Sequence, residues 1–328
     1  MHRGQLIRKI TVSSAAYVHD KDVDINAKVD ARLLDEKTNL CVARAVKALE
    51  ADAPGYQELH RVNMSYIITS MQSTHFAMKK LLGSGPDEPE SIDAMVLARV
   101  NLEGLYALCL MFESAAYVDR YLQDGWRKTY VKFILQREET KKLSRFDDYS
   151  KRIGPANLTG LRGIFGITEA QQQTVDYEEL GTPLPPGVKP LPIARFPTPG
   201  GIIDRIPAGD RRRMLERLYL EYQRLSSFTH GLSEANQFKE MCRRNSRFAN
   251  LLPVQQLKET HHREIEEHSW IISRLGIIQA AAELTSLYKS DIDLCAAATQ
   301  AWLEFSEGIL LGRTIWEIRT RRLLGVVI

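Results

Sequence analysis

The sequence predicts an all-α protein, built as a bundle of long antiparallel helices with one proline-rich loop inserted. Apolar residues recur every three to four positions through most of the chain, which is the period of an amphipathic helix. The sequence shows no convincing pair of alternating strands and no internal repeat. Eight of the 13 prolines fall within residues 181–209, so the helix-breaking residues are concentrated in one place.

The chain before the proline-rich segment divides into an arm and a series of helices. Residues 1–30 are weakly patterned and are expected to form an N-terminal arm, whereas residues 31–328 are expected to form a single helical domain. The Gly-Ser-Gly-Pro run at 83–86 and Gly125 end the helical pattern, because glycine and proline disfavour a helix. The expected helices in this part are 34–52, 55–82, 91–122 and 126–142.

A long extended loop is expected at 181–209, because each proline removes a backbone donor and clashes with the preceding helical turn. Loops of this length are often functional or act as linkers. After the loop, Asp210 is the predicted N-cap of a helix that ends near Leu225, and residues 226–231 interrupt this helix. The helices expected beyond the interruption are 233–248, 254–288 and 291–322.

Charge, apolar stretches and cysteines limit the class of protein. With 44 Lys and Arg against 41 Asp and Glu, the net charge of +3 excludes a strongly basic nucleic-acid coat but is compatible with a local basic site. The two most apolar stretches, 102–118 and 270–287, both contain charged residues, so no membrane partner is expected. The four cysteines are far apart, which is typical of a reduced cytoplasmic protein.

Motifs for nucleotide-binding loops and for the serine elbow of hydrolases are absent from the sequence, and no cofactor is expected. A metal site is a weaker alternative, because Glu259, His262 and Glu266 share one face of the predicted 254–288 helix and Glu103 could face them. Di-iron sites in helical bundles use two Glu-x-x-His motifs, whereas this chain has one. A solvated charged helix face explains the same residues.

Arg224 lies just before the predicted helix break and His230 lies within it, and the two residues suit metal-independent RNA cleavage. A histidine with a pKa near neutrality can take a proton from a ribose 2′-hydroxyl, and a guanidinium can stabilise the negative charge that develops on the phosphate. The alternative is a helix-end histidine held by Ser226 or Ser227, with Arg224 in a salt bridge. About two Arg–His pairs at such spacings are expected by chance, so spacing alone does not decide between them.

Basic residues accumulate around this pair. Residues 204–247 contain ten basic and six acidic residues, a balance that suits contact with a phosphate backbone. A helix surface with internal ion pairs is the other interpretation. The arginines expected to contact RNA are Arg211, Arg212, Arg213, Arg217, Arg243, Arg244 and Arg247.

Two short motifs resemble a known family. Arg99 and Glu103 lie four residues apart in a long apolar helix, and Tyr222 begins a Tyr-Gln-Arg-Leu-Ser-Ser-Phe-Thr-His stretch that ends at His230. Over about residues 55–290, this ordered pair resembles a family of bacterial helical proteins known mainly as a domain of unknown function. Its members carry an R-x3-E helix followed by a Tyr…Leu-Ser-x3-His turn. That family is similar to the HEPN superfamily, whose active members are dimeric, metal-independent ribonucleases with an Arg-x4-6-His motif.

The resemblance implies a role for each matching residue. His230 would act as general base or acid and Arg224 would stabilise the phosphate, while Arg99 and Glu103 would orient the turn or form a buried ion pair. Leu225 departs from the pattern, because active HEPN motifs usually have a polar residue directly after the arginine.

The leading hypothesis is therefore a ribonuclease of a toxin or phage-defence system. Its expected partners are RNA, a second copy of the chain in a homodimer, and the product of a neighbouring gene. The first alternative is a non-catalytic helical scaffold, in which C-terminal helices containing Trp270, Trp302 and Trp316 bind a partner. The second alternative is a bundle metal-binding protein.

Overall fold

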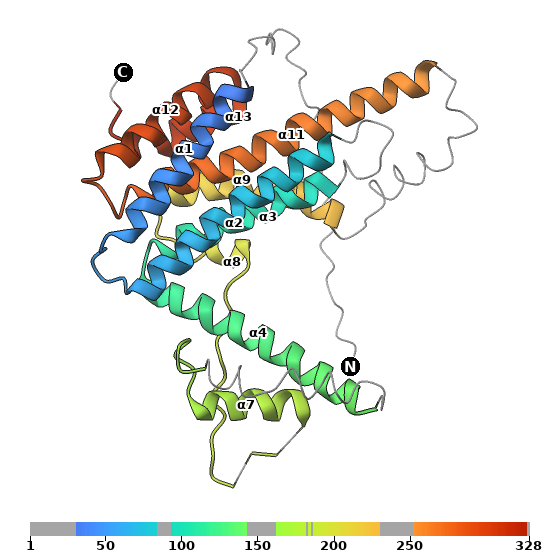
Figure 1. The fold of residues 1–328 in the computed structure, drawn as a ribbon, viewed down its shortest axis with the longest axis vertical. Coiled ribbons are helices and arrows are strands. Elements are labelled where there is room, and N and C mark those ends of the chain that lie inside the picture. The colour runs from blue at the N-terminus through green and yellow to red at the C-terminus, as the bar shows by residue number, and fades with distance from the viewer. Residues whose placement is uncertain are drawn as a thin grey trace, which may run out of the picture.

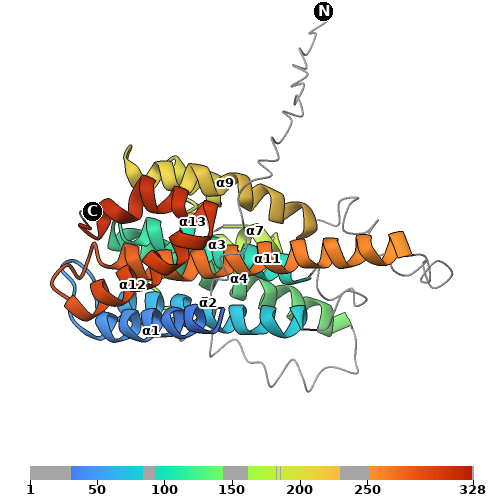
Figure 2. The ribbon, with the colours of Figure 1, turned by 90° about the horizontal axis from the view of Figure 1, so that it is seen from above.

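The computed structural model describes residues 31–83, 93–142, 162–181, 183–184, 186–229 and 252–326. These residues form packed helices with no strand among them, which confirms the predicted all-α bundle (Figures 1 and 2). The predicted arm at 1–30 and the predicted helix at 233–248 lie outside the described part of the chain.

Local sequence signals mark several of the helix starts. Thr168 caps α7 through a capping box with Gln171, and Asp291 caps α12 by accepting a hydrogen bond from the Leu294 amide. The helical elements are α1 (Ala31–Glu50), α2 (Glu58–Leu82), α3 (Asp93–Met111), α4 (Ala115–Lys142), α7 (Glu169–Leu180), α8 (Pro199–Ile203), α9 (Asp210–Thr229), α11 (Leu252–Leu284), α12 (Ile292–Gly308), α13 (Leu310–Ile315), η4 (Trp316–Thr320) and α14 (Arg321–Leu323).

Helix α3 lies at the centre of the bundle and packs against α2, α9 and α11. Small residues allow this close packing: a Cβ on Gly104 would lie 2.8 Å from the Met71 side chain, and one on Gly276 would lie 3.3 Å from the Asn101 carbonyl oxygen. Among the described helices, α3 alone is long and apolar enough to cross a membrane. Because 67% of its most apolar 18-residue window is buried inside the fold, its apolar character is that of a core helix.

Helix α4 leaves the bundle at an angle and forms a projection together with α7 (Figure 1). This α4–α7 arm has a small core of its own, in which Trp126 and Tyr130 stack with ring centroids 4.6 Å apart. The proline-rich segment contributes to it, because Ile193 packs there. The arm core consists of Trp126, Tyr130, Ile134, Ile167, Val175 and Ile193.

The proline-rich segment is more ordered than an extended loop. Residues 188–198 have no regular secondary structure, but the unpredicted helix α8 follows them. Pro199 occupies the first helical position, where its missing N–H costs no hydrogen bond. Ile202 and Ile206 are buried in the main core, so burial of apolar side chains holds this part of the segment in place.

Two predicted boundaries are wrong in the first and middle parts of the chain. The helix expected at 91–122 breaks at 112–114, and α4 then runs through Gly125, where a glycine is tolerated at a cost of about 1 kcal/mol. Helix α9 continues through the predicted break at 226–231 as far as Thr229.

The helix expected at 291–322 is also divided. Ile309 is extended, with φ −129° and ψ 114°, and α13 begins directly after it. The chain turns back so tightly that a Cβ on Gly312 would lie 2.7 Å from the Phe305 ring. The turn therefore depends on a glycine whose packing role is not visible in the local sequence.

A fully buried carboxylate joins α9, α11 and η4. Glu283 accepts hydrogen bonds from Arg211 at 2.7 Å and from Arg319 at 2.8 and 2.9 Å. Burial by itself raises the pKa of Glu283, but the hydrogen bonds from Arg319 and the positive charges of both arginines outweigh it. The pKa of Glu283 is therefore below its ordinary value, and the network holds three elements together.

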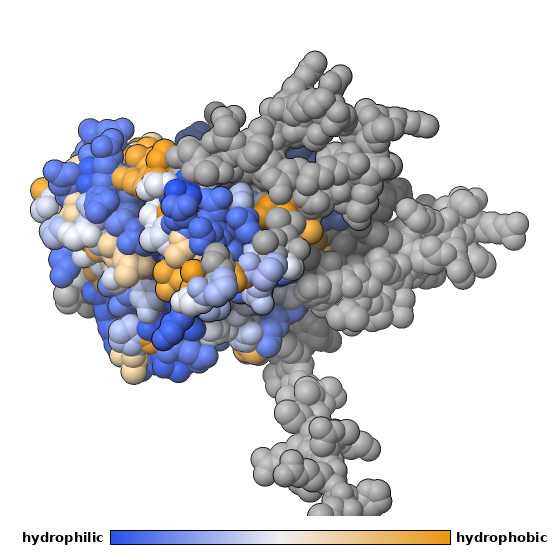
Figure 3. All heavy atoms as spheres, turned by 90° about the horizontal axis from the view of Figure 1, so that it is seen from below, coloured by the Kyte–Doolittle hydropathy of each residue, from blue (hydrophilic) through white to orange (hydrophobic). Residues whose placement is uncertain are grey.

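The surface shows no broad apolar face in the view of Figure 3, where apolar side chains form small separate patches among hydrophilic ones. The tryptophans expected to contact a partner lie largely inside the fold: Trp302 and Trp316 are buried in the core. Trp270 is half-buried, with the Arg274 guanidinium 3.4 Å from its ring centroid. The rings of Trp302 and Trp316 therefore stabilise the core.

Candidate functional site

The two sequence motifs meet in space although more than a hundred residues separate them. On α3, Arg99 Nη2 lies 3.0 Å from Glu103 Oε1 in an ion pair. The Tyr222 hydroxyl on α9 accepts a hydrogen bond from Arg99 Nη2 at 3.0 Å and donates to Glu103 Oε1 at 3.1 Å. The guanidinium carbon also lies 5.1 Å from the Tyr222 ring centroid. These groups form a closed hydrogen-bonded set, the Arg99–Glu103–Tyr222 unit.

Neighbouring aromatic rings hold Tyr222 in place. Its ring stacks on Tyr219 with centroids 5.8 Å apart and meets Tyr106 edge-on at 6.2 Å. The Tyr106 hydroxyl donates to the Leu215 carbonyl at 2.6 Å, which fastens α3 to α9. Within the described part of the chain, the buried Nε of Arg99 has no hydrogen-bond partner. Because this nitrogen is buried, the fold encloses the donor between α3 and α9.

The end of α9 presents different groups on different sides. The Ser226 hydroxyl donates to the Tyr222 carbonyl at 2.7 Å, so it is used within the helix. Arg224 lies about 200° around the helix from Tyr222. On that side, burial and then the charge of Arg224 lower the pKa of His268 on α11 to about 4. His268 Nε2 lies 3.4 Å from Glu221 Oε2.

The described arginines of the expected RNA surface all have carboxylate partners within the protein. Arg211 is largely buried and pairs with Glu113 and Glu283. Internal pairing therefore accounts for much of the basic character at the start of α9. The other pairs lie along α9 itself, Arg212 with Glu216, Arg213 with Asp210, and Arg217 with Glu221.

Several expected site residues lie outside the described part of the chain. They are His230, Arg243, Arg244 and Arg247, together with the side chains of Ser227, Glu259 and His262. The Arg224–His230 pair therefore remains a prediction. Of the expected metal ligands, Glu266 is exposed and Glu103 is engaged with Arg99. Where side chains are described, no three His, Cys, Asp or Glu residues gather as a metal site would require.

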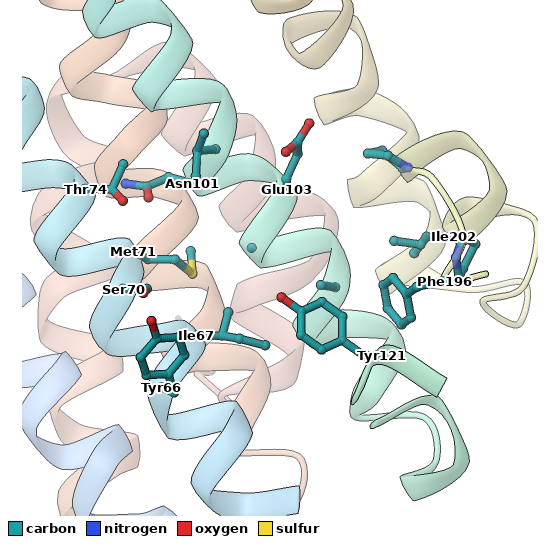
Figure 4. Close-up of a pocket in the computed structure, with 15 residues that line it drawn as sticks. Tyr66, Ile67, Ser70, Met71, Thr74, Asn101, Glu103, Tyr121, Phe196 and Ile202 are labelled. Atoms are coloured by element: carbon teal, nitrogen blue, oxygen red, sulfur yellow. The ribbon is translucent and has the colours of Figure 1, made fainter. Parts of the chain in front are cut away.

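A pocket of about 380 Å³ opens between α2, α3, the start of α4 and residues 196–202 (Figure 4). Its volume is in the range of small-ligand sites, about 300–1,000 Å³. Glu103 lines the pocket and also belongs to the Arg99–Glu103–Tyr222 unit, so the two features adjoin. The polar and aromatic side chains of the wall are Tyr66, Ser70, Thr74, Asn101, Glu103, Tyr121 and Phe196.

A chain of polar groups, buried except for the partly exposed Asp35, connects four helices and ends at Asn101 in the pocket wall. His75 Nε2 on α2 lies 3.4 Å from Asp35 Oδ1 on α1, and His75 Nδ1 lies 2.9 Å from Ser273 Oγ on α11. The Asn101 amide nitrogen on α3 donates to the same serine oxygen at 2.6 Å. The sequence analysis does not predict this set, because its members share no local motif.

Charge and burial determine where the protons lie in this set. Burial raises the pKa of Asp35, but hydrogen bonds from neighbouring basic side chains outweigh it, so Asp35 is ionised at neutral pH. Burial lowers the pKa of His75 to about 4, so the ring is neutral. A neutral ring facing a carboxylate keeps its proton on Nε2, and Nδ1 accepts from Ser273. Ser273 must then accept from the Asn101 amide nitrogen.

This arrangement leaves the carbonyl Oδ1 of Asn101 as the open end of the set. The atom is buried and has no hydrogen-bond partner among the described residues. Ser, His and Asp in sequence also form the triads that activate a serine in hydrolases. Here Ser273 is fully buried and does not line the pocket, so the set positions Asn101 instead of exposing a nucleophile.

Comparison of the chain with protein-family models, with curated proteins and with solved structures finds no significant match. Inferences about function therefore depend on the two adjoining features, the Arg99–Glu103–Tyr222 unit and the pocket.

Proposed function

We propose that this chain is a metal-independent endoribonuclease of HEPN-like type that cleaves RNA at the end of α9. The supporting observation is the Arg99–Glu103–Tyr222 unit, in which the R-x3-E helix directly contacts the first residue of the second motif. The unit places a guanidinium, a carboxylate and a phenol together beside a pocket.

The proposed reaction is attack of a ribose 2′-oxygen on the adjacent phosphorus. His230, the residue directly after α9, takes the 2′-hydroxyl proton, and a proton is returned to the leaving 5′-oxygen as the P–O5′ bond breaks. A 2′,3′-cyclic phosphate results. Arg224 stabilises the charge on the phosphate.

The proposal also covers the oligomeric state of the protein and its regulation. Two copies form a homodimer with the ends of α9 facing a shared cleft, and a neighbouring gene product restrains the nuclease, as a toxin or phage-defence system requires. The buried free thiols of Cys41 and Cys109 suit the reducing cytoplasm.

An RNA-cleavage assay in excess chelator tests the proposal. Wild-type protein is expected to produce fragments ending in 2′,3′-cyclic phosphate, and His230→Ala is expected to lower the rate by about 100-fold or more, as for loss of a general acid–base. Arg44→Ala, which removes an ion pair with Asp293 between α1 and α12, is the control and should cleave normally. Intact RNA at high protein concentration, or full activity of His230→Ala, would contradict the proposal.

A non-catalytic scaffold is the second candidate, and the projecting α4–α7 arm favours it (Figure 1). An arm with its own core can present a surface to a partner without disturbing the bundle. The half-exposed Tyr177 on α7 allows a test. In cells carrying the gene, a scaffold loses its phenotype in Tyr177→Lys and keeps it in His230→Ala, whereas a nuclease shows the opposite dependence.

A further inference from the structure

We infer that the pocket between α2, α3 and α4 binds a nucleobase, with the ring against aromatic side chains and an N–H of the base donating to Asn101 Oδ1. The pocket chemistry selects an uncharged planar ring that carries an N–H donor. The choice of a nucleobase among such rings rests on the proposed function, because an RNA-cleaving site has bases beside the scissile phosphate.

The first argument is the fixed orientation of Asn101. Its amide nitrogen is held by Ser273, whose own proton goes to His75, so the amide cannot rotate to offer a donor. The open group is therefore an acceptor, and a buried acceptor without a partner is costly. A ligand that donates an N–H here relieves this cost, whereas a ligand that presents another acceptor is rejected.

The second argument is the shape and composition of the walls. Figure 4 shows Tyr66 on α2 on one side of the pocket and Tyr121 and Phe196 on the other. Tyr121 and Phe196 support each other edge-to-face at 5.0 Å between centroids. Tyr66 is 70% exposed, so its ring can adjust to a ligand. Proteins that bind unpaired bases use aromatic rings in this way.

The third argument is charge. Glu103 is the one charged residue that the described part of the chain contributes to the pocket wall, and its Oε1 is paired with Arg99 at 3.0 Å. The pocket consequently has no uncompensated charge for a phosphate or an ammonium group.

Calorimetric titration of the full-length chain tests the inference. Adenosine and purine riboside differ only in the exocyclic amino group, so the pair isolates the donor to Asn101. Adenosine is expected to bind. Purine riboside is expected to bind with an affinity at least about fivefold lower, because it leaves the buried Asn101 acceptor without a donor. Tyr66→Ala is expected to weaken adenosine binding about tenfold through lost stacking. Tyr177→Ala, an exposed tyrosine outside the pocket, is the matched control and should bind normally.

A 2′-O-methyl oligoadenylate, which lacks the attacking hydroxyl, distinguishes a base within a strand from a free nucleoside. If the oligonucleotide binds more tightly than adenosine, the ligand is a base within an RNA strand. If it binds equally or more weakly, the ligand is a free nucleoside. Equal affinities for adenosine and purine riboside, or an unchanged affinity in Tyr66→Ala, would overturn the inference. Adenosine binding without RNA cleavage would refute the proposed function alone, and cleavage without binding of either probe would refute the pocket inference alone.

Discussion

Acidification from about pH 7.5 to about pH 5 is expected to destabilise the protein through His75. The ring is buried, and burial together with the charge of Arg274 lowers its pKa from 6.5 to about 4, although Asp35 acts in the opposite direction. The unfolded chain takes up this proton near pH 6.5, whereas the folded chain does so only near pH 4. The stabilising contribution of the neutral ring is therefore complete above pH 6.5 and is lost as the pH falls towards 4.

The two pKa values determine the size of the effect. A difference between 6.5 and about 4 corresponds to about 3 kcal/mol when the loss is complete. At about pH 5 the protonation of the unfolded state has removed about 2 kcal/mol of this. Because domains are typically stable by about 5–15 kcal/mol, the loss is large enough to measure.

Urea unfolding followed by circular dichroism, at several pH values, measures this effect. His75→Gln cannot take up the proton, and its amide can still accept from Ser273. The free energy of unfolding of the wild type should fall by about 2 kcal/mol more than that of the variant over this range. His268→Gln should remove a separate and similar amount, because the pKa of His268 is also lowered to about 4. Parallel pH profiles for wild type and His75→Gln would refute the proton assignment, and with it the orientation of Asn101.

Two further stability predictions follow from packing and from charge, both measured by urea unfolding. Gly312→Ala is expected to cost about 1–3 kcal/mol, because its Cβ would meet the ring and backbone of Phe305, whereas Gly104→Ala should cost less, since the flexible Met71 side chain can move. The reverse order would contradict this packing. Glu283→Gln is expected to cost about 3–5 kcal/mol, because it leaves two arginines beside a neutral buried group. A loss below about 1 kcal/mol would show that the buried carboxylate is not needed to balance them.

The helical class was predictable because apolar spacing records which face of each helix is buried. Two helix boundaries were not predictable, because they depend on contacts between segments that apolar spacing does not describe. Gly312 has an ordinary position within a helical pattern, and only its contact with Phe305 requires the turn at Ile309. Helix α9 likewise continues past Leu225 into a segment of weak helix formers, where burial of that leucine against the core offsets their low propensity.

The candidate site was predictable only in part. Arg99 and Glu103 could be named because they lie one helical turn apart, a spacing that sequence records directly. Their contact with Tyr222 requires α3 and α9 to pack together, which no local pattern specifies. The set that ends at Asn101 contains one residue from each of four helices, so no spacing along the sequence predicts it.

The sequence by itself determined the all-α class, the positions of most helices and one side of the candidate site. Only the tertiary structure decided which polar groups have partners: the arginines at the start of α9 are paired with carboxylates, whereas the buried carbonyl oxygen of Asn101, a residue of the pocket wall, has no partner among the described residues. The physical reason is that periodicity encodes burial along one helix, whereas the state of a polar or charged group depends on the groups that surround it in space.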